Sequence, residues 1–308
     1  MSQTVSQSAE PHVPYDGRDF APLIGCSLIW GSTWFAITFQ LGSVPAAVSV
    51  AYRFGLAGVL LFVWLAAARR PIRLTRAQHL ATAAQGALTF GINYIFVYFA
   101  EARLNSAVVA VIFAALAFVN LAVFRLALGI RAPRRAWAGA ALGVAGVAVL
   151  FLGELGRANL SPRALAGLGF GLVALLSAAL GNLAARRAQT LHVEVGANAA
   201  WGMIYGAAIV AIGATMAGQQ WRFDFSPAYV GSLVYLALFG SVIAFVLYFT
   251  LARRRGYVLA SYISAVTPAI AMLISAMFEH ARWGVGALLG LALVVAGQVL
   301  LAKAPRGA

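Results

Sequence analysis

The chain consists almost entirely of long apolar stretches separated by short polar connectors. Read with a window of about 19 residues, ten stretches approach the roughly 20 residues that a helix needs to cross about 30 Å of hydrocarbon. A soluble helix would keep a polar face for water, whereas 62% of these residues are hydrophobic and only 10% are charged. The sequence therefore predicts an all-α polytopic membrane protein. The ten predicted spans are Phe20–Phe39, Ala47–Ala68, His79–Phe99, Asn105–Leu126, Ala136–Leu152, Leu165–Ala185, Asn198–Ala217, Ala228–Thr250, Val258–Phe278 and Gly284–Ala302.

The connectors leave no room for a folded soluble domain, so we expect the function to lie inside the bundle. The polar segment Met1–Asp19 is predicted to be a disordered cytoplasmic tail, and residues 303–308 a second one. Met1–Asp19 lacks the basic start of a secretory signal, so the first apolar stretch is predicted to be a retained span. The single cysteine, Cys26, excludes an intramolecular disulfide and a Cys-based metal site. We expect neither a metal nor a cofactor.

The net charge of +14 follows a topological pattern. If the N-terminus lies in the cytoplasm, 15 basic residues fall in inside connectors and only five, Arg103, Arg157, Arg163, Arg222 and Arg282, fall outside. This bias follows the positive-inside rule. The charge therefore predicts an integral plasma (inner) membrane protein with both termini cytoplasmic, and it argues against nucleic-acid binding.

The two halves of the chain resemble each other. Tyr98–Arg103 matches Tyr248–Arg253 at an offset of 150 residues. Gly31-Ser32 falls on Gly181-Asn182 at the same offset. These matches predict a duplication of five spans, residues 20–152 and 165–302. Because five is odd, the second copy enters the membrane from the opposite side, and such inverted five-helix repeats are typical of transporters.

Three GxxxG motifs lie in the predicted spans. They are Gly139–Gly143 in span five, Gly167–Gly171 in span six and Gly286–Gly290 in span ten. Small residues four apart allow two helix backbones to approach closely in lipid. The motifs predict close packing inside the bundle, with a homodimer seam along spans five and ten as the alternative.

Several short motifs resemble those of one carrier family. Trp30–Ile37 is similar to the WGS-x-x-x-A-I opening of EamA-type carriers in the drug/metabolite transporter superfamily, and Tyr52-Arg53-Phe54 resembles their RF element. Asn93-Tyr94, Tyr98 and Ser106–Val111 resemble their span three–four segment, and Thr267-Pro268 their second TP motif. The resemblance covers roughly residues 20–302.

This resemblance implies ten helices in two inverted repeats and the movement of small metabolites, often the export of amino acids or related solutes. The chain departs from the family in span four, where Ala115-Leu116 replaces the usual Pro-Leu. Pro268 in span nine is therefore the predicted hinge of the second half, with a kink over Ser264–Pro268. Span four is predicted to be straighter near Ala115.

No Asp or Glu is predicted at mid-membrane depth, because all eight acidic residues lie in the tail, in connectors or at span ends. Proton-coupled exporters of cations need a buried carboxylate that exchanges a proton for the substrate. Export of lipophilic cations by that mechanism is therefore disfavoured. Polar neutral and aromatic side chains remain as candidates to line a solute pathway, although such residues also join helices by hydrogen bonding. Together with the charged Arg53, the candidates are Trp30, Ser32, Trp34, Asn93, Tyr94, Tyr98, Asn182, Tyr248, Tyr262 and Thr267.

Two of these candidates have explicit alternatives. Arg53 lies about seven residues into span two, roughly 10 Å below the outer surface, where a charge usually marks a functional site. It could bind a substrate carboxylate, or it could be a structural charge that snorkels outward or pairs with helix-end carbonyls or Glu101. Tyr98 and Tyr248 could form gates or belong to interfacial aromatic belts.

The sequence therefore predicts a secondary transporter of small organic metabolites rather than an enzyme. The alternative is a membrane-embedded enzyme or a non-transporting structural subunit, but no nucleophile–base set is present. A Walker-type loop is also absent, since the lone lysine, Lys303, is followed by Ala304. The expected partners are a small-molecule substrate and the lipid bilayer.

Overall fold

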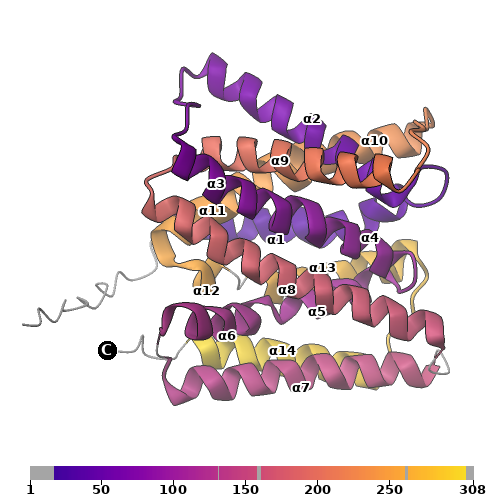
Figure 1. The fold of residues 1–308 in the computed structure, drawn as a ribbon. Helices are drawn as coiled ribbons and strands as arrows, with labels where there is room; N and C mark the ends of the chain where they lie inside the picture. The colour runs from indigo at the N-terminus through magenta and orange to yellow at the C-terminus, as the bar shows by residue number, and fades with distance from the viewer. Residues whose placement is uncertain (1–16, 131, 158–160, 261–262, 303–308) are drawn as a thin grey trace, which may run out of the picture.

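The computed structural model describes residues 17–130, 132–157, 161–260 and 263–302 and shows a bundle of long helices that run in similar directions (Figure 1). All regular structure in these ranges is helical. The helices are α1 (Gly17–Thr38), α2 (Ala46–Ala67), α3 (Arg76–Gln85), α4 (Asn93–Glu101), α5 (Ser106–Ala114), α6 (Leu116–Leu128), α7 (Arg134–Arg157), α8 (Pro162–Thr190), α9 (Val195–Met216), α10 (Pro227–Ala237), α11 (Ala244–Arg255), α12 (Tyr257–Ala260), α13 (Ile263–Phe278) and α14 (Val285–Ala302), and the π-helical segments are η1 (Gly86–Ile92) and η2 (Leu238–Ile243).

The helices follow the predicted spans, with ten helical units in all. Span three is the run α3–η1–α4, span four is α5–α6 and span eight is α10–η2–α11. Seven units are long and apolar enough to cross a membrane, and the apolar parts of α13 and α14 are shorter. The structure is therefore an all-helical membrane protein. Several boundaries differ from the prediction. Helix α8 ends at Thr190 where span six was predicted to end at Ala185, and α11 ends at Arg255 where span eight was predicted to end at Thr250. Helix α1 begins at Gly17, inside the predicted disordered tail, and residues 1–16 lie outside the described ranges.

Local sequence signals fix several helix ends. Thr75 forms a capping box with Gln78 at the start of α3, where side chain and backbone satisfy each other's free donors. Ser161 and Ser226 accept backbone hydrogen bonds at the starts of α8 and α10, each just before a proline. Gly129 ends α6 in the left-handed conformation, at φ 66°, which glycine adopts without a steric penalty.

The π-helical segments occupy corresponding places in spans three and eight. The 150-residue offset that aligns Tyr98 with Tyr248 places η1 over residues 236–242, and η2 covers Leu238–Ile243. A serine hydroxyl hydrogen-bonds to one backbone carbonyl in or beside each segment. Ser177 Oγ donates to Leu88 O within η1, and Ser241 Oγ donates to Leu236 O just before η2, both at 2.8 Å. Such segments are rare and frequently mark functional sites.

The prediction that span four is straighter near Ala115 is wrong. Helical hydrogen bonding is interrupted there, because α5 ends at Ala114 and α6 begins at Leu116. Ala115 N–H bonds to Ile112 O, three residues back, as in a tighter 3₁₀ turn. Ala114 O accepts a 2.8 Å hydrogen bond from the buried Gln298 amide of α14. A side chain from the other half of the chain therefore supports the break that lacks a proline.

Pro268 lies within the unbroken helix α13. A proline has no N–H for the carbonyl four residues earlier, here that of Ser264. Thr267 Oγ1 donates to Ser264 O at 3.2 Å, which is one way that membrane helices satisfy a backbone group freed by proline.

Helices α7 and α14 lie side by side at one edge of the bundle (Figure 1) and pack through glycines. A Cβ on Gly290 would lie 2.6 Å from Gly146 O, and a Cβ on Gly297 would lie 2.6 Å from Gly139 O. Gly143 is covered by the ring of Phe118. The glycines of spans five and ten therefore pack against residues of the same chain.

Candidate solute site

A cavity of about 80 Å³ lies among helices contributed by both halves of the chain. Its walls come from spans one, three and four of the first half and from spans six, eight and nine of the second, so corresponding spans contribute to it. The lining residues are Trp30, Thr33, Trp34, Ile37, Thr89, Asn93, Tyr94, Val97, Phe113, Leu116, Ala178, Asn182, Phe245, Tyr248, Ser264 and Thr267.

Hydrogen bonds across the bundle orient two of the lining side chains. Trp30 Nε1 donates to Gly240 O of η2 at 3.2 Å. Asn182 Nδ2 donates to Asn120 Oδ1 of α6, also at 3.2 Å. Each bond joins one half of the chain to the other, so the positions of these two side chains depend on how the halves sit together.

Three buried polar atoms at the cavity have no hydrogen-bond partner within the described part of the chain. They are Trp34 Nε1, Thr89 Oγ1 and Asn93 Oδ1, which are a donor, a hydroxyl and an acceptor. An unpaired buried polar group costs about 1–3 kcal/mol, so native proteins leave few of them without a reason. These atoms can therefore bind the polar part of a ligand.

The rest of the wall is aromatic and uncharged. The ring of Trp30 lies 5.1 Å from that of Phe245 and 5.2 Å from that of Tyr248. Trp34 contacts Phe113 at a ring distance of 5.1 Å. None of the described lining residues is charged. The lining therefore combines aromatic ring faces with a few neutral polar groups.

Arg53 lies beside the cavity without lining it. The side chain is fully buried, so it does not snorkel to the membrane surface. Its Nε donates to Ser241 Oγ at 3.1 Å, and its guanidinium carbon lies 4.5 Å from the ring centre of Tyr94, which does line the cavity. Neither terminal guanidinium nitrogen has a hydrogen-bond partner in the described chain.

The structure brings most of the predicted pathway residues together. Seven of the eleven line this one cavity: Trp30, Trp34, Asn93, Tyr94, Asn182, Tyr248 and Thr267. Ser32 lies outside it and contacts the Tyr235 hydroxyl at 2.6 Å. Tyr98 also lies outside it, and Tyr262 is outside the described residues. Tyr98 and Tyr248 are both buried inside the bundle, so neither belongs to an aromatic belt facing lipid.

Sequence reasoning missed several lining residues, including Thr89, Val97, Phe113 and Phe245. One signal could have found two of them, because Thr89, Asn93 and Val97 are spaced four apart and therefore share a helix face. The phenylalanines carry no such signal, since apolar residues surround them in sequence and only packing brings them to the cavity.

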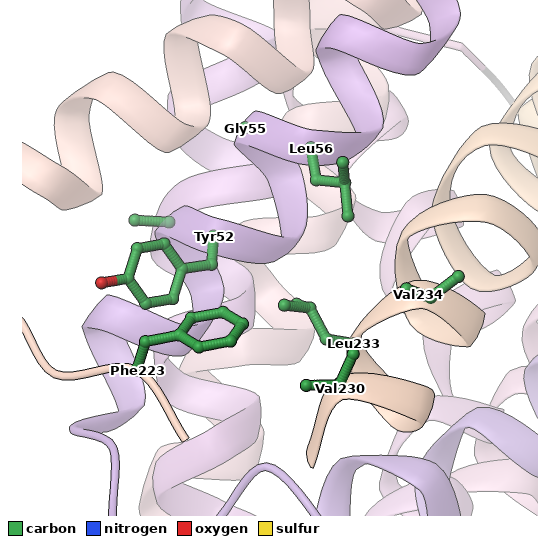
Figure 2. Close-up of a pocket in the computed structure, with 8 residues that line it drawn as sticks. Tyr52, Gly55, Leu56, Phe223, Val230, Leu233 and Val234 are labelled. Atoms are coloured by element: carbon green, nitrogen blue, oxygen red, sulfur yellow. The ribbon is translucent and has the colours of Figure 1, made fainter. Parts of the chain in front are cut away.

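A second hollow lies between α2 and α10 (Figure 2). It is larger, about 540 Å³, but its only polar side chain is Tyr52. Val234 and Phe223 on its wall are 47% and 39% exposed. In a membrane such an apolar groove faces lipid, so the smaller polar cavity is the better candidate for a solute site. The groove is lined by Ala51, Tyr52, Gly55, Leu56, Phe223, Val230, Leu233 and Val234.

A bundle of apolar helices around a buried, largely aromatic cavity with a few polar groups fits a membrane transport protein, and comparisons with known proteins identify the family. The model of the EamA-like transporter family matches residues 22–152 and again residues 165–303. The chain is 32% identical over 259 residues to the uncharacterized inner membrane transporter YedA of Escherichia coli K12, covering 83% of this chain and 81% of YedA. YedA of Escherichia coli O157:H7 matches equally. The chain belongs to the EamA-like transporter family.

A solved crystal structure has the same fold. It superposes with a TM-score of 0.71 at 18% sequence identity, covering 93% of this chain and 96% of the other. Membership of a transporter family is consistent with a protein that is not an enzyme, and it implies a small-molecule substrate and a lipid bilayer around the helices.

Proposed function

We propose that this chain is a secondary carrier that exports amino acids or related small organic solutes by alternating access. The main support is the cavity, which both halves of the chain enclose and which holds three polar atoms without a hydrogen-bond partner in the described chain. Two inverted five-helix repeats, residues 20–152 and 165–302, would rock around this site. The two family matches and the paired π-helical segments support the repeat.

The size of the cavity supports a cycle with more than one state. Ligand sites usually measure about 300–1,000 Å³, and a water molecule occupies about 30 Å³ of liquid. The cavity, at about 80 Å³, lies below this range. Binding requires the helices to separate, which is what an alternating-access carrier does on each side in turn.

A ligand screen tests this proposal. The only cysteine, Cys26, is fully buried, so a thiol-reactive dye reports thermal unfolding of the purified protein. We expect an amino acid, rather than a nucleoside or a sugar, to raise the unfolding temperature. Asn93→Ala should weaken that binding by about 1 kcal/mol, roughly five-fold. Ser32→Ala, on a residue outside the cavity, is the control and should bind normally. No stabilisation by any amino acid would count against the proposed solute class.

We further propose that the chain lies in the inner membrane with both termini cytoplasmic. In a Cys26→Ser background, a cysteine at Ser43 should react with a membrane-impermeant thiol reagent in intact cells. A cysteine at Arg135 should react only after the cells are opened. Both positions are exposed. Labelling of both in intact cells would contradict the proposed orientation.

Pro268 is the proposed hinge of the second half. Pro268→Ala restores a backbone donor for Ser264 O, which Thr267 now satisfies. We expect slower interconversion of the two access states, so turnover should fall more than solute affinity. Transport kinetics in proteoliposomes measure both, and an unchanged transport rate would rule out the hinge.

A homodimer through spans five and ten is not part of the proposal, because their glycines contact residues of the same chain.

A further inference from the structure

Four buried polar side chains join the two halves of the chain just beyond the cavity. Gln40, which follows α1, donates from Nε2 to Tyr229 O at 2.9 Å and to Ser232 Oγ at 2.6 Å. The hydroxyl oxygens of Ser49 and Tyr229 lie 2.8 Å apart in a hydrogen bond. All four side chains are buried. These four residues, the α10 cluster, therefore attach α10 of the second half to α1 and α2 of the first.

The α10 cluster lies about one helical turn from the cavity. Ile37 of α1 lines the cavity, and Gln40 N–H bonds back to Ile37 O at 2.8 Å. On α2, Ser49 precedes Arg53 by four residues, so the two share a helix face. The guanidinium of Arg53 lies 4.5 Å from the ring centre of the lining residue Tyr94. The cluster therefore closes the bundle between the cavity and the membrane face at which α1 ends.

The lipid-facing side of the α2–α10 contact is incompletely filled. The groove of about 540 Å³ separates the two helices there, with Gly55 of α2 and Val234 of α10 on its walls (Figure 2). A Cβ on Gly55 would meet no atom within 4 Å. By contrast, α2 packs closely on α9, where a Cβ on Gly58 would lie 2.7 Å from Ile204 Cδ1. Since protein interiors are normally close-packed, α10 depends on the hydrogen bonds of the α10 cluster for part of its attachment to α2.

The π-helical segment η2 follows α10 directly and is itself attached to the first half at the cavity. Ser241 Oγ accepts a 3.1 Å hydrogen bond from Arg53 Nε, and Gly240 O accepts one of 3.2 Å from Trp30 Nε1. Hinges often lie at the ends of helices, where a few residues absorb a change in backbone angles. The interrupted α-helical bonding of η2 is therefore a suitable pivot for α10.

We propose that α10 is the gate of the carrier on this face and that it turns about η2. While the α10 cluster is intact, α10 covers the cavity. When the bonds from Gln40 and Ser49 break, α10 moves away from α1 and α2, and the cavity opens to the face at which α1 ends. An exposed 2.8 Å bond from Ser43 Oγ to Asp224 Oδ2, between the loops before α2 and α10, must also open, and water can replace it. This inference rests on the proposed transport function.

Labelling of a cysteine in the cavity tests the gate without any solute. In a Cys26→Ser background, Val97→Cys places a thiol on the cavity wall, where Val97 is 1% exposed. In lipid nanodiscs we expect this thiol to react slowly with a polar thiol reagent. Tyr229→Phe and Ser49→Ala each break the hydroxyl pair that holds the gate closed. Each should therefore raise the labelling rate about five-fold, which is the effect expected for one hydrogen bond.

Tyr205→Phe is the matched control for the gate variants. The Tyr205 hydroxyl of α9 also joins the two halves, since it lies 2.7 Å from His79 Nδ1 of α3, but it does not contact α10. Its loss should leave the labelling rate unchanged. The double variant of Tyr229→Phe and Ser49→Ala should label more slowly than the product of the single effects predicts, because both substitutions break the same bond.

The pivot is tested by distances between spin labels in the same nanodiscs. Val59 of α2, Ala228 at the start of α10 and Phe239 of η2 are all exposed and can be replaced by labelled cysteines in the Cys26→Ser background. With Tyr229→Phe added, the distance from Val59 to Ala228 should gain a longer component. The distance from Val59 to Phe239 should stay the same, and equal lengthening of both would overturn the pivot at η2.

Parental labelling rates in both Tyr229→Phe and Ser49→Ala would overturn the gate. An equal increase in Tyr205→Phe would overturn it as well, because the cavity would then respond to any lost bond between the halves. Both faces are accessible in nanodiscs, so the result does not depend on the orientation of the chain in the cell. A failed solute screen would leave the labelling result intact, because no solute is used.

Discussion

Gly290→Ala should strongly destabilise the bundle. The added Cβ would lie 2.6 Å from both Gly146 O and the Cβ of Leu150, and the backbone of α7 cannot move away as a flexible side chain could. Overpacking of this kind costs about 1–3 kcal/mol, occasionally more. Gly146→Ala should have a similar effect, because its Cβ would lie 2.6 Å from Gly290 O. The reaction of Cys26 with a thiol dye during heating measures the loss.

Gly213→Ala is the matched control for this experiment. Gly213 also lies within a helix, α9, but a Cβ there meets no atom within 4 Å. Replacing such a glycine by alanine should leave stability unchanged or raise it by about 0.4–1 kcal/mol. If Gly290→Ala and Gly213→Ala behaved alike, α7 and α14 would not pack as the structure has them.

Arg53→Gln should lower transport of a solute with a free carboxylate far more than transport of its amidated analogue. Neither terminal nitrogen of Arg53 makes a hydrogen bond within the described chain, so both can donate to a carboxylate once Tyr94 turns aside. Losing a charge-assisted hydrogen bond costs about 1.5–3 kcal/mol, which is roughly ten-fold or more in affinity. Uptake of both solutes into proteoliposomes measures the difference.

Arg103→Gln provides the control for Arg53. Arg103 is also basic, but its Nη1 bonds to Phe99 O on its own helix turn, and its guanidinium carbon lies 4.7 Å from the ring centre of Phe170. The Arg103→Gln substitution should lower transport of both solutes only slightly and by the same factor. Equal losses for the two solutes in Arg53→Gln, with normal folding, would make Arg53 a structural residue.

The membrane spans could be predicted from sequence because lipid imposes one rule on the whole chain. Every span must be apolar and about 20 residues long, and this pattern is visible without any tertiary information. The break at Ala115 could not be predicted in this way. The carbonyl of Ala114 at this break accepts a hydrogen bond from Gln298, 184 residues away in sequence, and no local signal links the two. Using proline as the marker of a break therefore failed in span four.

The candidate site was predicted in part for a similar reason. Polar residues in apolar spans are conspicuous, and seven predicted ones line the cavity. Burial at a span end is not visible in a sequence. Glu101 was predicted to lie at a span end, as one possible partner of Arg53, and it is only 6% exposed.

The paired π-helical segments also bear on the ancestry of the chain. A π turn closes its hydrogen bond between residues five apart rather than four apart, so each segment corresponds to an inserted residue in an otherwise α-helical span. Both halves match the same family model, and both carry the segment at the corresponding place. The simplest history is one insertion in a single five-helix ancestor, followed by duplication and fusion of the gene. Related single-repeat proteins that predate the fusion would then be expected to carry the same extra residue in their third helix.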